Sequence, residues 1–312
     1  MPPTRSDRSA TLGRQLAIAC AFMFGANGVQ SHWFRSTGGT TPSLIAMRYV
    51  FGALLFAAVA MALRTRLPSG RMALAATLSG FLHVGFTACL LYGFQVSSVA
   101  LTVLLFYTYP LLVALGGVAL YREPLTGRRL ALVVLGICGV ALAVGTPGNV
   151  SLAGVLLGLG AGLSNSVLIL STQAMMRRGL AVEQIAGIGW IAPGACCALL
   201  WLAGVLPLPP PSPEAWSAGF TYAVFGTVVP VWIFYTSVKL IGASLTSFLA
   251  TLEPFVAALL AWALIAEPLA AGQIAGGALI VASVMALSLE RRRDELLVEE
   301  PPGQPVERVL RK

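Results

Sequence analysis

The sequence predicts an all-α integral membrane protein with ten transmembrane helices, arranged as two inverted five-helix repeats. Three observations lead to this prediction. Of the 312 residues, 57% are hydrophobic and only 10% are charged, whereas a soluble domain carries about 25% charged residues. Long apolar stretches recur from residue 16 to residue 289. A segment of the first half of the chain also reappears in the second half. A soluble enzyme with one hydrophobic tail is therefore excluded.

Ten apolar segments are long enough to cross a hydrocarbon core of about 30 Å as helices, which takes roughly 17 to 25 residues each. None shows the period-two alternation of a membrane barrel, so the predicted class is all-α. The segments span approximately 15–34, 43–63, 72–94, 97–121, 129–146, 152–176, 183–205, 216–239, 242–265 and 271–289.

Four regions follow from these segments. Residues 1–14 form a basic amino-terminal arm that is predicted to be cytoplasmic. Residues 15–146 contain the first repeat with spans 1 to 5, and residues 152–289 contain the second repeat with spans 6 to 10. Residues 290–312 are charged and contain three prolines, which predicts a disordered cytoplasmic tail.

The basic residues lie almost entirely on one side of the predicted membrane. Eighteen of the 20 Lys and Arg residues fall in the arm, in the tail or in connections after even-numbered spans, while Arg35 lies on the other side and Arg48 lies within a span. The positive-inside rule then places both termini in the cytoplasm and the chain in the cell (inner) membrane. The net charge of +8 reflects this topology. The expected partners are lipid and a small-molecule substrate, and no nucleic acid is expected.

An internal repeat relates the first half of the chain to the second. Leu101–Leu125 aligns without gaps to Leu245–Leu269, at a constant offset of 144 residues. Each half has five spans, and an odd number forces the second half into the opposite orientation. Inverted repeats are typical of secondary transporters. Identical pairs include Pro110 with Pro254 and Glu123 with Glu267.

Together with Gly25-Ala26-Asn27 in span 1 and Arg48 in span 2, these paired residues identify a family. The sequence resembles the drug/metabolite transporter superfamily, specifically its EamA-like ten-helix permeases, from about Gln15 to Leu289. The resemblance implies a central cavity between the two halves, export more often than import, and no cofactor. It says little about the substrate.

Only two charged residues lie well within spans, and each costs about 2.5 to 3.5 kcal/mol when placed centrally. Glu253 lies near mid-membrane, directly before Pro254. It is the candidate for proton coupling or for a cationic substrate; the alternative is a protonated structural group that bonds a neighbouring helix at the proline kink. Arg48 is a candidate partner for a substrate anion, and the alternative is a structural role at the external interface.

The substrate-binding candidates combine polar faces of repeat-related spans with aromatic side chains. Thr246 shares a helical face with Glu253, and the repeat relates these positions to Thr102 and Tyr109, with Phe106 on the same face. Asn27 and Asn165 belong to polar stripes on spans 1 and 6. The complete predicted set is Asn27, His83, Thr102, Phe106, Tyr109, Asn165, Trp190, Trp232, Tyr235 and Thr246.

The predicted function is a secondary-active transporter that exports small metabolites, such as amino acids or amphiphilic drugs, by alternating access. The alternatives are an intramembrane enzyme or a channel, but the spans contain no catalytic dyad, metal-ligand cluster or repeated filter loop. We therefore expect neither an enzyme nor a metal site. Two GxxxG motifs, at Gly154 and Gly272, predict close helix contacts, either within one chain or in a homodimer.

Overall fold

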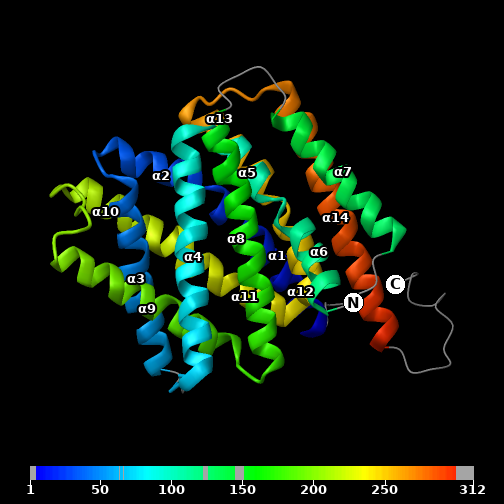
Figure 1. The fold of residues 1–312 in the computed structure, drawn as a ribbon, viewed down its shortest axis with the longest axis horizontal. Coiled ribbons are helices and arrows are strands. Elements are labelled where there is room, and N and C mark those ends of the chain that lie inside the picture. Colours follow the sequence, from blue (N-terminus) through cyan, green and yellow to red (C-terminus); the bar gives the residue numbers. More distant parts are fainter. Residues whose placement is uncertain (1–4, 63, 66, 122–125, 145–150, 300–312) are drawn as a thin grey trace.

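The computed structural model describes residues 5–62, 64–65, 67–121, 126–144 and 151–299 (Figure 1). Within these ranges the chain is helical and contains no strand. Each predicted span corresponds to one helix or to one helix with an internal break. The predicted all-α class is therefore confirmed.

The first half contains spans 1 to 5. Spans 1 and 4 are each broken into two helices, whereas the other three are continuous. Its helices are α1 (Arg5–Gly25), α2 (Asn27–Ser36), α3 (Thr41–Ala62), α4 (Gly70–Val96), α5 (Val99–Phe106), α6 (Tyr109–Tyr121) and α7 (Gly127–Val144).

The second half contains spans 6 to 10. Span 8 includes a π-helical turn, labelled η1, and span 9 is broken into two helices. Its elements are α8 (Leu152–Arg177), α9 (Val182–Leu202), α10 (Pro213–Ala223), η1 (Val224–Val228), α11 (Val229–Ile241), α12 (Ala243–Ala250), α13 (Glu253–Ile265) and α14 (Ala271–Glu299).

The repeat seen in the sequence is also a repeat of backbone structure. Helices α12 and α13 begin and end 144 residues after α5 and α6 at every boundary. Both breaks come just before a proline, Pro110 in one half and Pro254 in the other. Proline has no N–H and leaves the carbonyl four residues earlier without its helical partner, so each break exposes polar backbone groups at the same place in its half.

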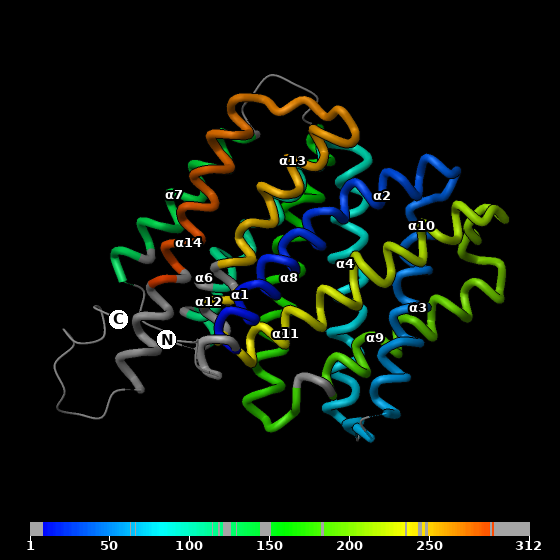
Figure 2. Tube along the Cα trace, turned by 180° about the vertical axis from the view of Figure 1, so that it is seen from behind, coloured from blue at the N-terminus to red at the C-terminus, as the bar shows by residue number. Residues whose placement is uncertain are grey.

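The helices of the two halves pack against each other. Helix α7 lies beside α14 at one end of the molecule, and α3 packs on α9 and α10 at the other (Figure 2). Helix α4 contacts both α8 and α9, and α1 contacts α11. Glycine permits the closest approaches: a Cβ on Gly80 would lie 2.8 Å from the Cα of Gly189, and one on Gly139 would lie 3.0 Å from the backbone nitrogen of Ile280.

Small residues of the GxxxG motifs serve contacts within the chain. A Cβ on Gly158 would lie 2.7 Å from the Cβ of Leu105. A Cβ on Gly276 would lie 2.6 Å from the backbone nitrogen of Ala143. These positions need glycine for packing between helices of one molecule, and they do not require a second copy.

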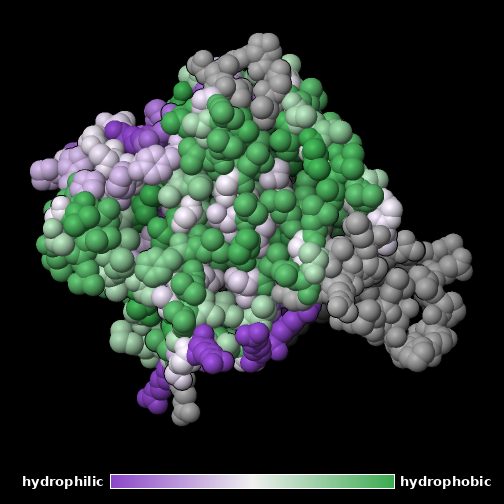
Figure 3. All heavy atoms as spheres, in the orientation of Figure 1, coloured by the Kyte–Doolittle hydropathy of each residue, from purple (hydrophilic) through white to green (hydrophobic). Residues whose placement is uncertain are grey.

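The outer surface suits a lipid environment. Six helical segments are long and apolar enough to cross a membrane, with shorter apolar helices at Leu130–Ala143, Glu253–Ile265 and Ala271–Leu287. Large apolar side chains face outward, for example Leu78, Leu156 and Trp262, each more than half exposed. The middle of the molecule is broadly hydrophobic in Figure 3, and hydrophilic side chains gather at its lower edge and near α2.

Helices extend into both predicted flanking regions. Helix α1 begins at Arg5, inside the predicted arm, and α14 continues to Glu299, inside the predicted tail. Residues 290–299 are rich in Glu, Arg and Leu, which favour helix. Residues 300–312 lie outside the described part of the chain.

Candidate functional site

A hydrogen bond between the halves lies at the two helix breaks. Tyr107, in the break between α5 and α6, is 1% exposed, and its hydroxyl donates to Oε2 of Glu253 at 2.9 Å. Glu253 is the first residue of α13 and is only partly buried. The same hydroxyl lies 2.7 Å from the carbonyl oxygen of Ala250. That carbonyl would normally accept from residue 254, but Pro254 has no N–H to donate.

A continuous series of aromatic rings leads from this bond to Trp190 on α9. We define the aromatic row as Trp190, His83, Phe86, Phe106, Tyr107 and Tyr109. His83 lies edge-on to Trp190 at 4.9 Å between ring centroids and is stacked on Phe86 at 5.4 Å. Phe106 is 5.3 Å from Phe86 and is stacked on Tyr109 at 5.0 Å.

The row belongs to both halves, since Trp190 is on α9 and the other five residues are on α4, α5, α6 and the break between α5 and α6. Tyr49 of α3 fixes the position of His83: its hydroxyl lies 2.9 Å from Nδ1 of His83 and 2.9 Å from Oγ1 of Thr87. Tyr49 is also stacked on Trp190 at 5.1 Å. The imidazole ring is therefore held between a hydrogen bond and two aromatic neighbours.

A buried arginine lies beside the Trp190 end of the row. Arg48 is 3% exposed, and its Nη1 donates to the hydroxyl of Tyr222 at 3.1 Å. The guanidinium carbon lies 5.8 Å from the Trp190 ring centroid and 5.7 Å from that of Tyr222, within cation–π range. Arg48 is thus held inside the protein.

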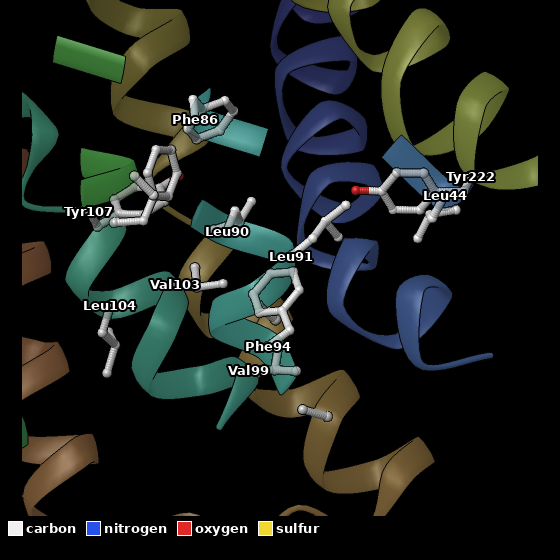
Figure 4. Close-up of a cluster of buried hydrophobic side chains, with 14 of the residues drawn as sticks. Leu44, Phe86, Leu90, Leu91, Phe94, Val99, Val103, Leu104, Tyr107 and Tyr222 are labelled. Atoms are coloured by element: carbon white, nitrogen blue, oxygen red, sulfur yellow. The ribbon is translucent and has the colours of Figure 1, made fainter. Parts of the chain in front are cut away.

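Tyr222 and Tyr107 belong to one buried apolar cluster. Figure 4 shows the two rings on opposite sides of it, with Leu90, Leu91 and Val103 between them and the Tyr222 hydroxyl turned towards the other side chains. This cluster packs the two polar ends of the site against a common apolar centre.

Five of the predicted substrate and proton residues come together in this arrangement, namely His83, Phe106, Tyr109, Trp190 and Glu253. Asn27 lies instead against η1, close to Gly226. Asn165 is partly buried on α8.

Three predicted residues lie apart from the row. Thr102 and Thr246 are fully buried, and their hydroxyls donate to backbone carbonyls of Ser98 and Gly242, four residues earlier. Such back-bonding leaves no donor for a ligand. Trp232 is 49% exposed on α11, where it faces outward. The side chain of Tyr235 lies outside the described part of the structure.

Tyr107, Phe86, Tyr49 and Tyr222 were not predicted. For Tyr107 the reason is geometric, since a continuous span 4 places Tyr109 opposite Glu253, whereas the break after Phe106 brings Tyr107 to that place. The Thr-Tyr-Pro sequence at residues 108–110 is the signal for the break. The other three gave no sequence signal beyond their aromatic character.

Glu267, in the connection after α13, bonds the other half of the molecule. Its carboxylate accepts from the backbone nitrogens of Val99 and Ala100 at 2.9 and 3.1 Å. It therefore caps the amino end of α5, in the other half of the molecule, where a negative charge is favoured. Its repeat mate Glu123 lies outside the described residues.

Comparisons with known proteins agree with this architecture. The profile of the EamA-like transporter family matches twice, at residues 11–145 and 152–289. An uncharacterized transporter from Archaeoglobus fulgidus is 28% identical over 259 residues, which covers 83% of this chain and 90% of that protein. A solved crystal structure has the same fold, with a TM-score of 0.64 and 18% identity over 89% of this chain and 98% of the other. Two matches that together cover most of the sequence, one for each half, show that the chain belongs to the EamA-like transporter family and is a membrane transporter, not an enzyme.

Proposed function

We propose that this transporter is a secondary-active exporter of small organic metabolites, such as amino acids or amphiphilic drugs. It works by alternating access and couples export to proton entry through Glu253. The observation that carries the proposal is the bond between Tyr107 and Glu253, which joins the two halves at the helix breaks and ends the aromatic row.

The hydrogen bonds around Tyr107 give Glu253 a way to couple proton binding to the contact between the halves. Tyr107 has one hydroxyl proton but lies within hydrogen-bond distance of two acceptors, the Ala250 carbonyl and Glu253. With a proton on Glu253, the carboxyl group can donate to Tyr107 while Tyr107 donates to Ala250. When the proton leaves, only one of the two bonds can be kept. Proton release therefore weakens the link between the halves.

The aromatic row supports an amphiphilic organic substrate. Aromatic faces bind apolar and cationic groups, and hydroxyl groups at the row's edges supply hydrogen bonds. Tyr109, His83 and Glu253 are each only partly buried, so part of the row keeps some exposed surface.

Alternating access is supported by the repeat itself. Two inverted halves can exchange their arrangements, so that a contact made on one side in one state is made on the other side in the next. The cap of Glu267 on α5 is such a contact, since it joins the connection after α13 to the other half. The basic residues indicate that the chain lies in the cell (inner) membrane with both termini in the cytoplasm. In that orientation this contact lies on the external side and closes the substrate path there.

The test uses inside-out membrane vesicles that contain the protein. An acidic interior is expected to drive accumulation of labelled amino acids or cationic drugs, and a protonophore to abolish it. Vesicles without the protein provide the control. If uptake depends on no ion gradient and the internal concentration never exceeds the external one, transport is facilitated diffusion, as expected of a channel. That result would contradict proton coupling.

A further inference from the structure

A group of polar side chains lies near the Trp190 end of the aromatic row, where α2, α3, α10 and η1 meet. We define the polar cluster as Asn27, Gln30, Arg48, Tyr222 and Thr227. Arg48 is 3% exposed, Asn27 6% and Thr227 0%, and Gln30 is partly buried. Such polar residues inside a membrane protein are rare and mark functional sites.

Four atoms of the polar cluster are buried without a hydrogen-bond partner: Nε of Arg48, Oδ1 of Asn27, Oε1 of Gln30 and Oγ1 of Thr227. Native proteins leave few buried polar atoms unpaired, because each one has lost its water without a replacement. Only five such side-chain atoms occur in the described part of the chain, and four of them are here. The concentration indicates a missing ligand with hydrogen-bond donors and acceptors.

The two unpaired amide oxygens point to the same place. A Cβ on Gly226 would collide with Oδ1 of Asn27 and would lie 3.0 Å from Oε1 of Gln30 and 3.4 Å from the Tyr222 ring. Only glycine lets both amide oxygens approach η1 this closely. Gly226 belongs to the π-helical turn η1, and such turns occur frequently at functional sites.

Tyr222 connects these oxygens to the positive charge. One edge of its ring lies beside Gly226, and its hydroxyl accepts from Nη1 of Arg48. No carboxylate among the residues described forms an ion pair with Arg48. A buried guanidinium without an anion is costly, so an anionic ligand group would supply what the protein does not.

We propose that the polar cluster binds the head group of an α-amino acid. The carboxylate pairs with Arg48, and the ammonium group donates to the amide oxygens of Asn27 and Gln30. A zwitterion is the complement of these atoms, since a simple anion would leave the amide oxygens unpaired and a simple cation would be repelled by Arg48. The side chain then lies along Trp190 and His83, because Trp190 contacts both Arg48 and the row.

This proposal rests on the proposed transport function, and its test separates the two. Three solutes with the same ring are compared as competitors of exchange in proteoliposomes: phenylalanine, phenethylamine, which lacks the carboxylate, and 3-phenylpropionate, which lacks the ammonium group. The wild type is expected to prefer phenylalanine at least 10-fold over either analogue. Exchange with none of a wide panel of solutes would contradict transport itself, whereas exchange without preference for the zwitterion overturns the head-group site alone.

Single substitutions in the polar cluster test which residues cause the preference for the zwitterion. Arg48→Gln is expected to weaken competition by phenylalanine at least 10-fold and to strengthen competition by phenethylamine, because the charge that repels its ammonium group is gone. Asn27→Leu is expected to weaken competition by phenylalanine and to leave that by 3-phenylpropionate unchanged. Arg71→Gln, at an exposed arginine of α4, is the matched control and should change neither. Because each ratio is measured within one variant, it does not depend on the amount of folded protein.

Arg48→Lys covers the case in which Arg48→Gln does not fold, since it keeps the charge and loses the planar fork. Arg48→Lys is expected to weaken competition by phenylalanine 3- to 10-fold and to leave competition by phenethylamine unchanged. Equal effects of the Arg48 and Asn27 variants on all three solutes would show that the polar cluster is structural and is completed by water, and would overturn the proposal.

Discussion

The hydroxyl of Tyr107 lies within hydrogen-bond distance of both Glu253 and the carbonyl of Ala250, which Pro254 leaves unpaired. One tyrosine of the first half thus bonds both ends of the helix break in the second half. This contact connects the proline of the repeat to the carboxyl group of Glu253.

Removing this hydroxyl tests the contact. In Tyr107→Phe the Ala250 carbonyl loses its donor, and an unpaired buried acceptor costs about 1 to 3 kcal/mol of unfolding free energy. We expect a lower midpoint of thermal unfolding in detergent and reduced proton-driven accumulation. Tyr92→Phe, at a 37% exposed tyrosine of α4, should leave both unchanged. Equal stability of the two variants would contradict the role given to Tyr107.

Glu267 is predicted to hold the external side closed. Glu267→Gln removes the charge that caps α5, a contact worth about 1 kcal/mol. A cysteine introduced at Ser98, in a background without other cysteines, is expected to react several-fold faster with a membrane-impermeant thiol reagent added outside. Glu214→Gln, at an exposed glutamate of α10, is the control. Unchanged reactivity would show that the cap does not contribute to closure.

The aromatic row predicts a dependence on ring contacts. Phe106→Leu keeps an apolar side chain but loses the stacking on Tyr109, and an aromatic contact contributes about 0.5 to 1.5 kcal/mol. The concentration of an aromatic solute at half-maximal exchange should rise about 2- to 12-fold. Phe255→Leu changes a 50% exposed phenylalanine on α13 and should have no such effect. A similar rise for both variants would place substrate elsewhere.

The topology is predicted from the basic residues and from the inverted repeat. Reporter enzymes fused after Arg66 and after Pro211 should give signals from opposite compartments, with Arg66 in the cytoplasm. Fusions on one side of the membrane would contradict both the topology and the inverted arrangement of the halves.

The sequence predicted the fold well because hydrophobicity, charge and the repeat all act at the level of whole helices. The positions of individual side chains in the site were harder to predict, because helical periodicity assumes an unbroken helix. The breaks before Pro110 and Pro254 shift the inward face, so Tyr107 takes the place expected for Tyr109. Thr102 and Thr246 share the predicted face, but their hydroxyls bond carbonyls of their own helices. The pairing of Arg48 with Tyr222, 174 residues away, has no local signal.

Net transport and exchange in Glu253→Gln test the central claim, proton coupling at Glu253, most directly. The amide of glutamine can donate to Tyr107 as a protonated carboxyl group does, so the protein should fold, but it cannot release a proton. The account predicts that proton-driven accumulation is lost, while exchange of labelled for unlabelled substrate, which moves no net proton, continues near the wild-type rate. Wild-type accumulation in Glu253→Gln would contradict it.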